Sequence, residues 1–189
     1  MARAFAALSL IMIWWVGILA TVEGGHQNAP LADSLISLIP QDRELEGWVR
    51  DGAPAVCHDE ASLSEYIDGA APYYLERGAL AVLFQYYLQP TSGGEAKIEI
   101  FRLRDGDSAR LLFAEIQRGK PPSQEREVKE LGEGRHLDQA LQGVYLLEFY
   151  EGPFFVRIEG RGEGLSARRA VIQFGLRVCQ SIRVESKAQ

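Results

Sequence analysis

The chain contains two cysteines, Cys57 and Cys179, and three histidines. In an oxidising compartment the two cysteines can form one disulfide. The alternative is two buried thiols, since Cys179 borders an apolar helical stripe. Their spacing contains no CxxC or zinc-ligand pattern. A Cys–His nucleophile would need His58 or His136 beside a thiol, but neighbours on a strand, such as Cys57 and His58, point to opposite faces. The cysteines are therefore predicted to be structural.

Two short segments offer metal ligands, His58-Asp59-Glu60 and His136-Leu137-Asp138. They lack a recognisable ligand spacing, and acidic residues before a helix are favoured electrostatically in any case. The glycine-rich segments 132–134 and 160–164 are not P-loops, and their glutamates would repel phosphate. No metal or cofactor is predicted.

Residues 62–78 have apolar residues at helical spacing, with a capping-box pattern at Ser62 and Glu65. Pro72 lies inside this pattern and predicts a kink or break near Gly69. A charged residue and a glycine at a helix break suggest a shaped backbone site, so the candidate ligand-binding residues are Tyr66, Asp68, Gly69 and Tyr73. The alternative is local capping and close packing of the helix on a sheet.

The elements that must position these residues follow as two hairpins, each with a helix after it. The hairpins are 80–88 with 97–103 and 144–150 with 154–158, and the helices start at Asp107 and Ser166. Residues 120–135 read as an exposed loop with an edge strand around Val128. Because hairpins rather than crossovers join the strands, the predicted fold class is α+β, an antiparallel sheet with helices packed on it.

Aromatic residues are dense on the first helix and on both hairpins. Alternation along a strand separates Tyr86 from Tyr87, and Phe154 from Phe155, onto opposite faces. Some aromatics must therefore leave the core face, either to line a concave binding surface or to be covered by a second helical layer.

Residues 4–22 form an uncharged apolar run behind Arg3. This pattern is typical of a secretory signal peptide, with a cleavage position after Ala20, and its length also fits an uncleaved membrane anchor. Either way everything after Glu23 is exported. The predicted domains are 1–22 signal or anchor, 23–34 spacer, and 35–185 a single α+β domain.

Composition sets limits on partners. Twenty Lys+Arg against 26 Asp+Glu give a net charge of −6, so a nucleic-acid backbone is an unsuitable partner. The 47% hydrophobic content of 189 residues is that of a folded chain rather than a disordered one.

The segment YIDGAAPYYLERG at 66–78 resembles the Tyr-Ile-(Asp/Asn)-Gly-(Gly/Ala)-Ala signature of an uncharacterised bacterial exported family, domain of unknown function six-five-nine-nine. Segments 38–41, 97–103 and 143–158 add weaker similarity, and Pro72 departs from the family pattern. The resemblance implies an exported α+β domain and supplies no catalytic or binding residues.

The expected function is a non-enzymatic binding module of the cell envelope, extracytoplasmic, whose partner is an envelope protein or a small ligand. Membrane contact would come only through the N-terminal segment. The alternative is an extracytoplasmic hydrolase that uses carboxylates around Asp68, such as Glu76.

Overall fold

A computed structural model describes residues 29–122 and 128–188. Its centre is a six-stranded antiparallel sheet with the strand order β1-β2-β3-β6-β5-β4. The strands are β1 (Val49–Cys57), β2 (Ala79–Gln89), β3 (Gly94–Leu103), β4 (Gly134–Leu141), β5 (Val144–Glu151) and β6 (Phe154–Arg161). The α+β class, with helices packed on an antiparallel sheet, is confirmed.

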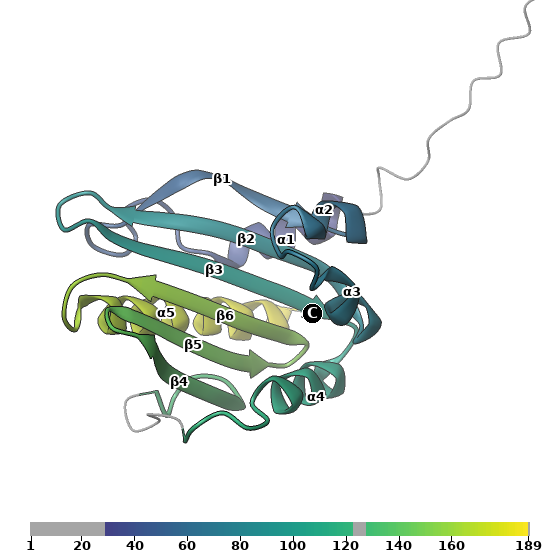
Figure 1. Cartoon of the computed structure of the whole chain (residues 1–189). Coiled ribbons are helices and arrows are strands. Elements are labelled where there is room, and N and C mark those ends of the chain that lie inside the picture. The colour runs from purple at the N-terminus through teal and green to yellow at the C-terminus, as the bar shows by residue number, and fades with distance from the viewer. Residues whose placement is uncertain (1–28, 123–127, 189) are drawn as a thin grey trace, which may run out of the picture.

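Helices cover both faces of this sheet (Figure 1). One face carries α1 (Ala29–Leu38) and α5 (Ser166–Ala188); the other carries α2 (Glu60–Ser64), α3 (Ala71–Glu76) and α4 (Gly106–Ile116). The two helices that follow the predicted hairpins, α4 and α5, therefore pack on opposite faces of the sheet.

The larger core lies between the sheet and α5. The predicted apolar stripe of this helix is buried, including Ala170, Phe174 and Ile182. Gly160 of β6 allows the close approach: a Cβ there would lie 2.7 Å from Val171 Cγ1 and 2.9 Å from the Ala167 carbonyl oxygen. A side chain at this position would push α5 away from the sheet.

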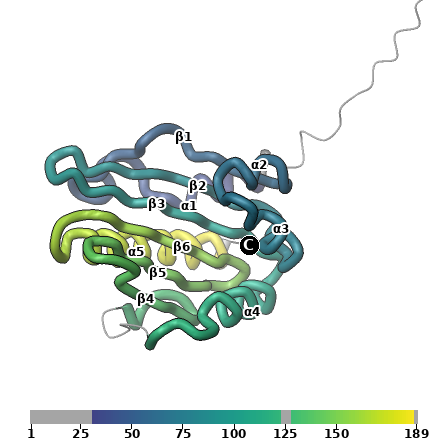
Figure 2. The backbone as a smooth tube through the Cα atoms, in the orientation of Figure 1, coloured from purple at the N-terminus to yellow at the C-terminus, as the bar shows by residue number. Residues whose placement is uncertain are grey.

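The smaller core lies on the other face and is confined to one end of the sheet. Phe84, Phe101 and Phe155 meet α2, α3 and α4 there. Among residues 29–122 and 128–188, no helix lies over the other end of this face, towards the β2–β3 turn (Figure 2). We call this end, which the described helices leave uncovered, the open half of the face.

The predicted helix of 62–78 is two short helices. Gly69 has φ +64°, and Pro72 occupies the first turn of α3, as a helix break at this point requires. The capping prediction is wrong in its residue: Asp59, not Ser62, caps α2, accepting from the Ser62 backbone N–H at 2.8 Å.

The local sequence pattern does not predict three of the elements. β1 contains Gly52 and Pro54 and shifts register between Asp51 and Ala55, which hides its alternation. β4 starts inside the predicted loop and is mostly polar, as an edge strand can be. α1 starts at Ala29, inside the predicted spacer, and Leu35 is fully buried.

The predicted edge strand is not found at Val128, which is buried outside any strand; its neighbours 123–127 lie outside the described residues. So does the predicted signal or anchor at 1–22. Among residues 29–122 and 128–188, no helix has the length and apolarity to cross a membrane.

Candidate functional site

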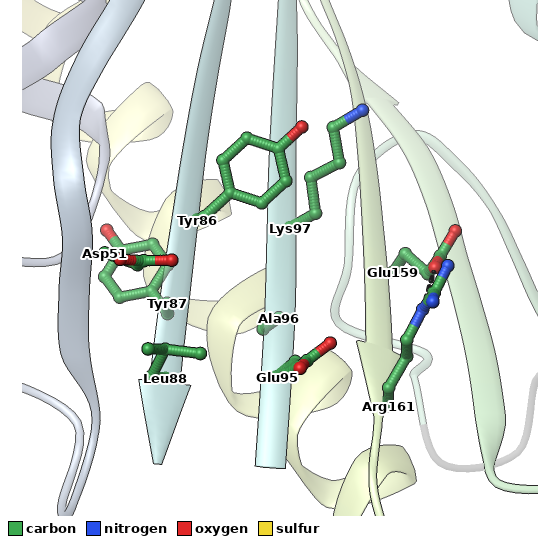
Figure 3. A pocket seen from close by; sticks show the side chains of 9 residues that line it. All are labelled: Asp51, Tyr86, Tyr87, Leu88, Glu95, Ala96, Lys97, Glu159 and Arg161. Carbon is green, nitrogen blue, oxygen red and sulfur yellow. Dashed lines mark hydrogen bonds and ion pairs between the residues drawn. The ribbon is translucent and has the colours of Figure 1, made fainter. Parts of the chain in front are cut away.

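The open half of the sheet face forms a cleft of about 390 Å³ (Figure 3). Its floor contains a row of side chains that the strand register sets side by side across four strands: Asp51 pairs with Tyr86, Tyr86 with Lys97, and Lys97 with Glu159. A second row, nearer the β2–β3 turn, consists of Leu88, Glu95 and Arg161. We call these seven residues the open cleft.

Alternation along β2 explains why aromatic surface appears in the open cleft. Tyr86 and Leu88 point to the open face and are 42% and 37% exposed. Tyr87 between them points into the larger core, where its hydroxyl donates to the Pro40 carbonyl at 2.8 Å. Burial raises the pKa of Tyr87 to about 12. The two adjacent tyrosines, which the sequence pattern places on opposite faces, therefore have different roles: Tyr86 is exposed in the open cleft, and Tyr87 packs in the larger core.

Both cations of the open cleft already have carboxylate partners. Lys97 Nζ lies 2.6 Å from Glu99 Oε1, and Arg161 Nε lies 2.7 Å from Glu159 Oε1. The side chains of Asp51 and Glu95 are exposed and form no hydrogen bond or ion pair within the described residues. Glu159 and, more weakly, Glu95 raise the pKa of Arg161. The cleft thus presents an aromatic ring, neutralised cations and two unused carboxylates.

Two positions further along the strands, next to the residues that line the cleft, lies a mostly charged row that we call the inner wall. In register from β2 to β4 this row contains Phe84, Glu99, Arg157, Glu148 and His136. Glu148 is fully buried and Glu99 is 5% exposed. The row separates the open cleft from the smaller core.

Arg157 is the centre of this wall. Its guanidinium lies 2.9 Å from Glu148 and 3.8 Å from Glu99, and it donates to the Tyr74 hydroxyl at 3.3 Å. Glu148 also accepts from Gln117 at 2.8 Å and from Lys120. Buried charges persist only when they are paired and hydrogen-bonded in this way.

The pKa values follow from the same contacts. Burial by itself would raise the pKa of Glu148, but Arg157, Lys120 and Gln117 outweigh it and hold the pKa below its ordinary range. Burial likewise would lower the pKa of Lys97, and Glu99 and Tyr86 together raise it above the usual value. Both groups are therefore charged at neutral pH.

The structure places the predicted site residues apart. Tyr66 stacks on Phe84, with ring centroids 4.7 Å apart, and so borders the inner wall. Tyr73 instead lies under the Arg77 guanidinium, 3.7 Å from its ring centroid. Asp68 and Gly69 are exposed and do not line the cleft. Only Tyr66 comes close to the open cleft.

Of the two alternatives for the cysteines, a disulfide or two buried thiols, the structure has the buried thiols. Cys57 and Cys179 are both buried free thiols, in the clusters on opposite faces of the sheet. Burial raises both thiol pKa values. Within the described ranges no group of three or more His, Cys, Asp or Glu side chains could hold a metal ion.

The sequence pattern does not indicate that Asp51, Lys97, Glu159 and Arg161 belong to the candidate site. The alternation that separates Tyr86 from Tyr87 was the available signal, since it predicts an aromatic on a second face. Which charged residues share that face depends on the pairing of β1, β3 and β6, and pairing partners are not visible in the local pattern.

No protein-family model, no curated protein and no solved structure matches the chain. The resemblance to the exported family stays a prediction.

Proposed function

We propose that this chain is an exported, non-enzymatic binding module of the cell envelope and that the open cleft is its binding site. The observation that carries the proposal is the open half of an otherwise helix-covered sheet face, where Tyr86 and Leu88 remain exposed beside charged groups. Concave sites with aromatic surface and a few polar groups are the usual design for ligand binding.

Export is supported by the uncharged run at 4–22 behind Arg3. The inner wall supports a binding role, because Glu148 and Arg157 are hydrogen-bonded to each other and to neighbouring side chains on the strands beside the cleft floor.

The hydrolase alternative has less support. An acid–base pair of carboxylates needs a cleft and a raised pKa on one member. Asp68 and Glu76 are exposed, and the buried Glu148 has a lowered pKa, which suits a permanent ion pair rather than a proton donor.

Carboxyl footprinting tests the proposal. The full-length chain is incubated with envelope extract, and its carboxylates are labelled with a carbodiimide and an amine. We expect protection of Asp51 and Glu95, whereas Asp107, whose side chain is 85% exposed on α4, stays equally labelled. The Tyr86→Ala variant should lose the protection and Leu111→Ala, on α4, should keep it. Unchanged labelling of Asp51 and Glu95 in wild-type protein would overturn the proposal.

A further inference from the structure

We infer that the ligand of the open cleft is a neutral saccharide whose ring stacks on Tyr86. This inference rests on the proposed function and deepens it by naming the ligand class.

Tyr86 provides the stacking surface. Its ring projects from β2 towards β3 with one face turned outward from the sheet, and Leu88 adds apolar surface on the same strand (Figure 3). A pyranose has a face of C–H groups that packs on an aromatic ring, while its hydroxyls project at the edges. The row from Asp51 to Glu159 crosses three strand spacings, about 14 Å, and so extends beyond a single ring.

The polar groups around Tyr86 suit hydroxyls. Carboxylates are acceptors only, and Asp51 and Glu95 have no donor within the described chain. A sugar hydroxyl can donate to them and can accept from the partly exposed Lys97 ammonium. One ligand can therefore use each kind of group in the cleft.

An anionic ligand fits poorly. Lys97 and Arg161 are already paired with Glu99 and Glu159, and the remaining charged groups of the cleft, Asp51 and Glu95, are both negative. An anion would have to displace an existing ion pair and then face two like charges.

A cationic ligand also fits poorly over the ring. Lys97 Nζ already lies 5.6 Å from the Tyr86 ring centroid and 5.3 Å from that of Phe84. A second cation stacked on Tyr86 would face this ammonium at close range. A neutral ligand meets neither repulsion.

The test combines periodate, which destroys saccharides that carry vicinal diols, with defined oligosaccharides, one of which lacks internal vicinal diols. Envelope extract is divided into an untreated portion, a portion treated with protease, and a portion oxidised with periodate, which cleaves vicinal diols, and then quenched. We expect the untreated and protease-treated portions to protect Asp51 and Glu95 of the full-length protein from labelling, and the periodate-treated portion to lose this effect.

Defined probes then sort the ligand class: neutral cellohexaose, N-acetylchitohexaose and maltohexaose, anionic hexagalacturonate, and cationic spermine. A neutral hexasaccharide that binds should do so about tenfold more weakly to Tyr86→Ala, whereas Tyr86→Phe should retain most of the affinity because the ring remains. Leu111→Ala is the matched surface control.

The outcomes separate the two proposals. Protection that is abolished by protease overturns the saccharide inference and leaves the binding function standing. Protection that survives periodate does the same when no neutral hexasaccharide binds. Spermine or hexagalacturonate protecting Asp51 and Glu95 in place of every neutral probe also overturns it. No protection by any portion of the extract overturns the proposed function and the inference together.

Discussion

The Tyr66 ring lies parallel to the Phe84 ring, with centroids 4.7 Å apart and an interplanar angle of 11°. Phe84 and Tyr86 share one face of β2, two positions apart, so this stack joins the segment between α2 and α3 to the edge of the open cleft. Lys97 lies close to both strand aromatics and continues the contact to β3. The helix-break segment therefore supports the cleft through one aromatic residue.

Replacing Tyr66 by alanine should lower the free energy of unfolding by about 1–2 kcal/mol, because the stack and its buried area are lost. Binding at the open cleft should weaken as well, since Phe84 loses its cover. Tyr73→Ala is the control: Tyr73 contacts Arg77 and Tyr74 rather than the cleft. Chemical denaturation and footprinting measure the two effects. Equal losses of binding in both variants would contradict this assignment.

Replacing Glu148 by glutamine should destabilise the protein by about 2–3 kcal/mol. The change leaves Arg157 and Lys120 without their shared carboxylate, and the 27% exposure of each cation reduces the cost below that of a fully buried pair. Urea denaturation at neutral pH measures the difference. Glutamine has nearly the same shape as glutamate. Equal free energies of unfolding for the wild type and Glu148→Gln would therefore contradict the prediction.

The same variant isolates a pH dependence. The pKa of Glu148 in the folded protein lies below its ordinary value of 4.5, so the unfolded chain binds the proton more readily. Its stabilising contribution is complete above that ordinary value and is lost as the pH falls through the folded pKa. Below pH 4.5 the stability gap between wild type and Glu148→Gln should narrow. A gap that stays constant down to acid unfolding would show that Glu148 is not the titrating group.

Gly69 should tolerate asparagine better than valine. Its φ is +64°, and nothing lies within 4 Å of the position a Cβ would take, so strain rather than crowding is the cost. Gly69→Val should lose about 1–2 kcal/mol and Gly69→Asn distinctly less, because asparagine enters the left-handed region more easily. Thermal unfolding ranks the three proteins. A valine variant as stable as wild type would show that the break adopts another conformation.

The two cysteines should be unreactive free thiols in the native protein. Both are buried, and burial raises their pKa values, so few thiolates are available. A thiol reagent should label neither residue before unfolding and both after it, with or without prior reduction. A melting temperature that falls on adding reductant would instead reveal a disulfide.

Residues 1–30 should direct export. Fused to a reporter that is active only outside the cytoplasm, they should give activity, and changing the apolar run at 4–22 by two inserted arginines should abolish it. Mass spectrometry of the mature chain distinguishes cleavage after Ala20 from an intact anchor. Activity that is independent of the apolar run would contradict the prediction.

Local pattern was sufficient for much of the fold. Both hairpins, the apolar stripe of α5 and the break at Gly69 and Pro72 are readable because periodicity, turn residues and proline act over a few neighbouring positions. β1, β4 and α1 were not readable: a bulge, a polar edge strand and a short helix at the start of the domain carry weak local signals.

The cleft was decided by tertiary structure. The sequence by itself determined that Tyr86 and Tyr87 face opposite ways, since successive side chains of a strand alternate. Only the strand order and register brought Asp51, Lys97 and Glu159 beside Tyr86, and only the placement of α2, α3 and α4 at one end of the face left that row open. Burial and charge pairing depend on contacts between residues that are far apart in the chain, so they are determined only when the sheet and its helices pack together.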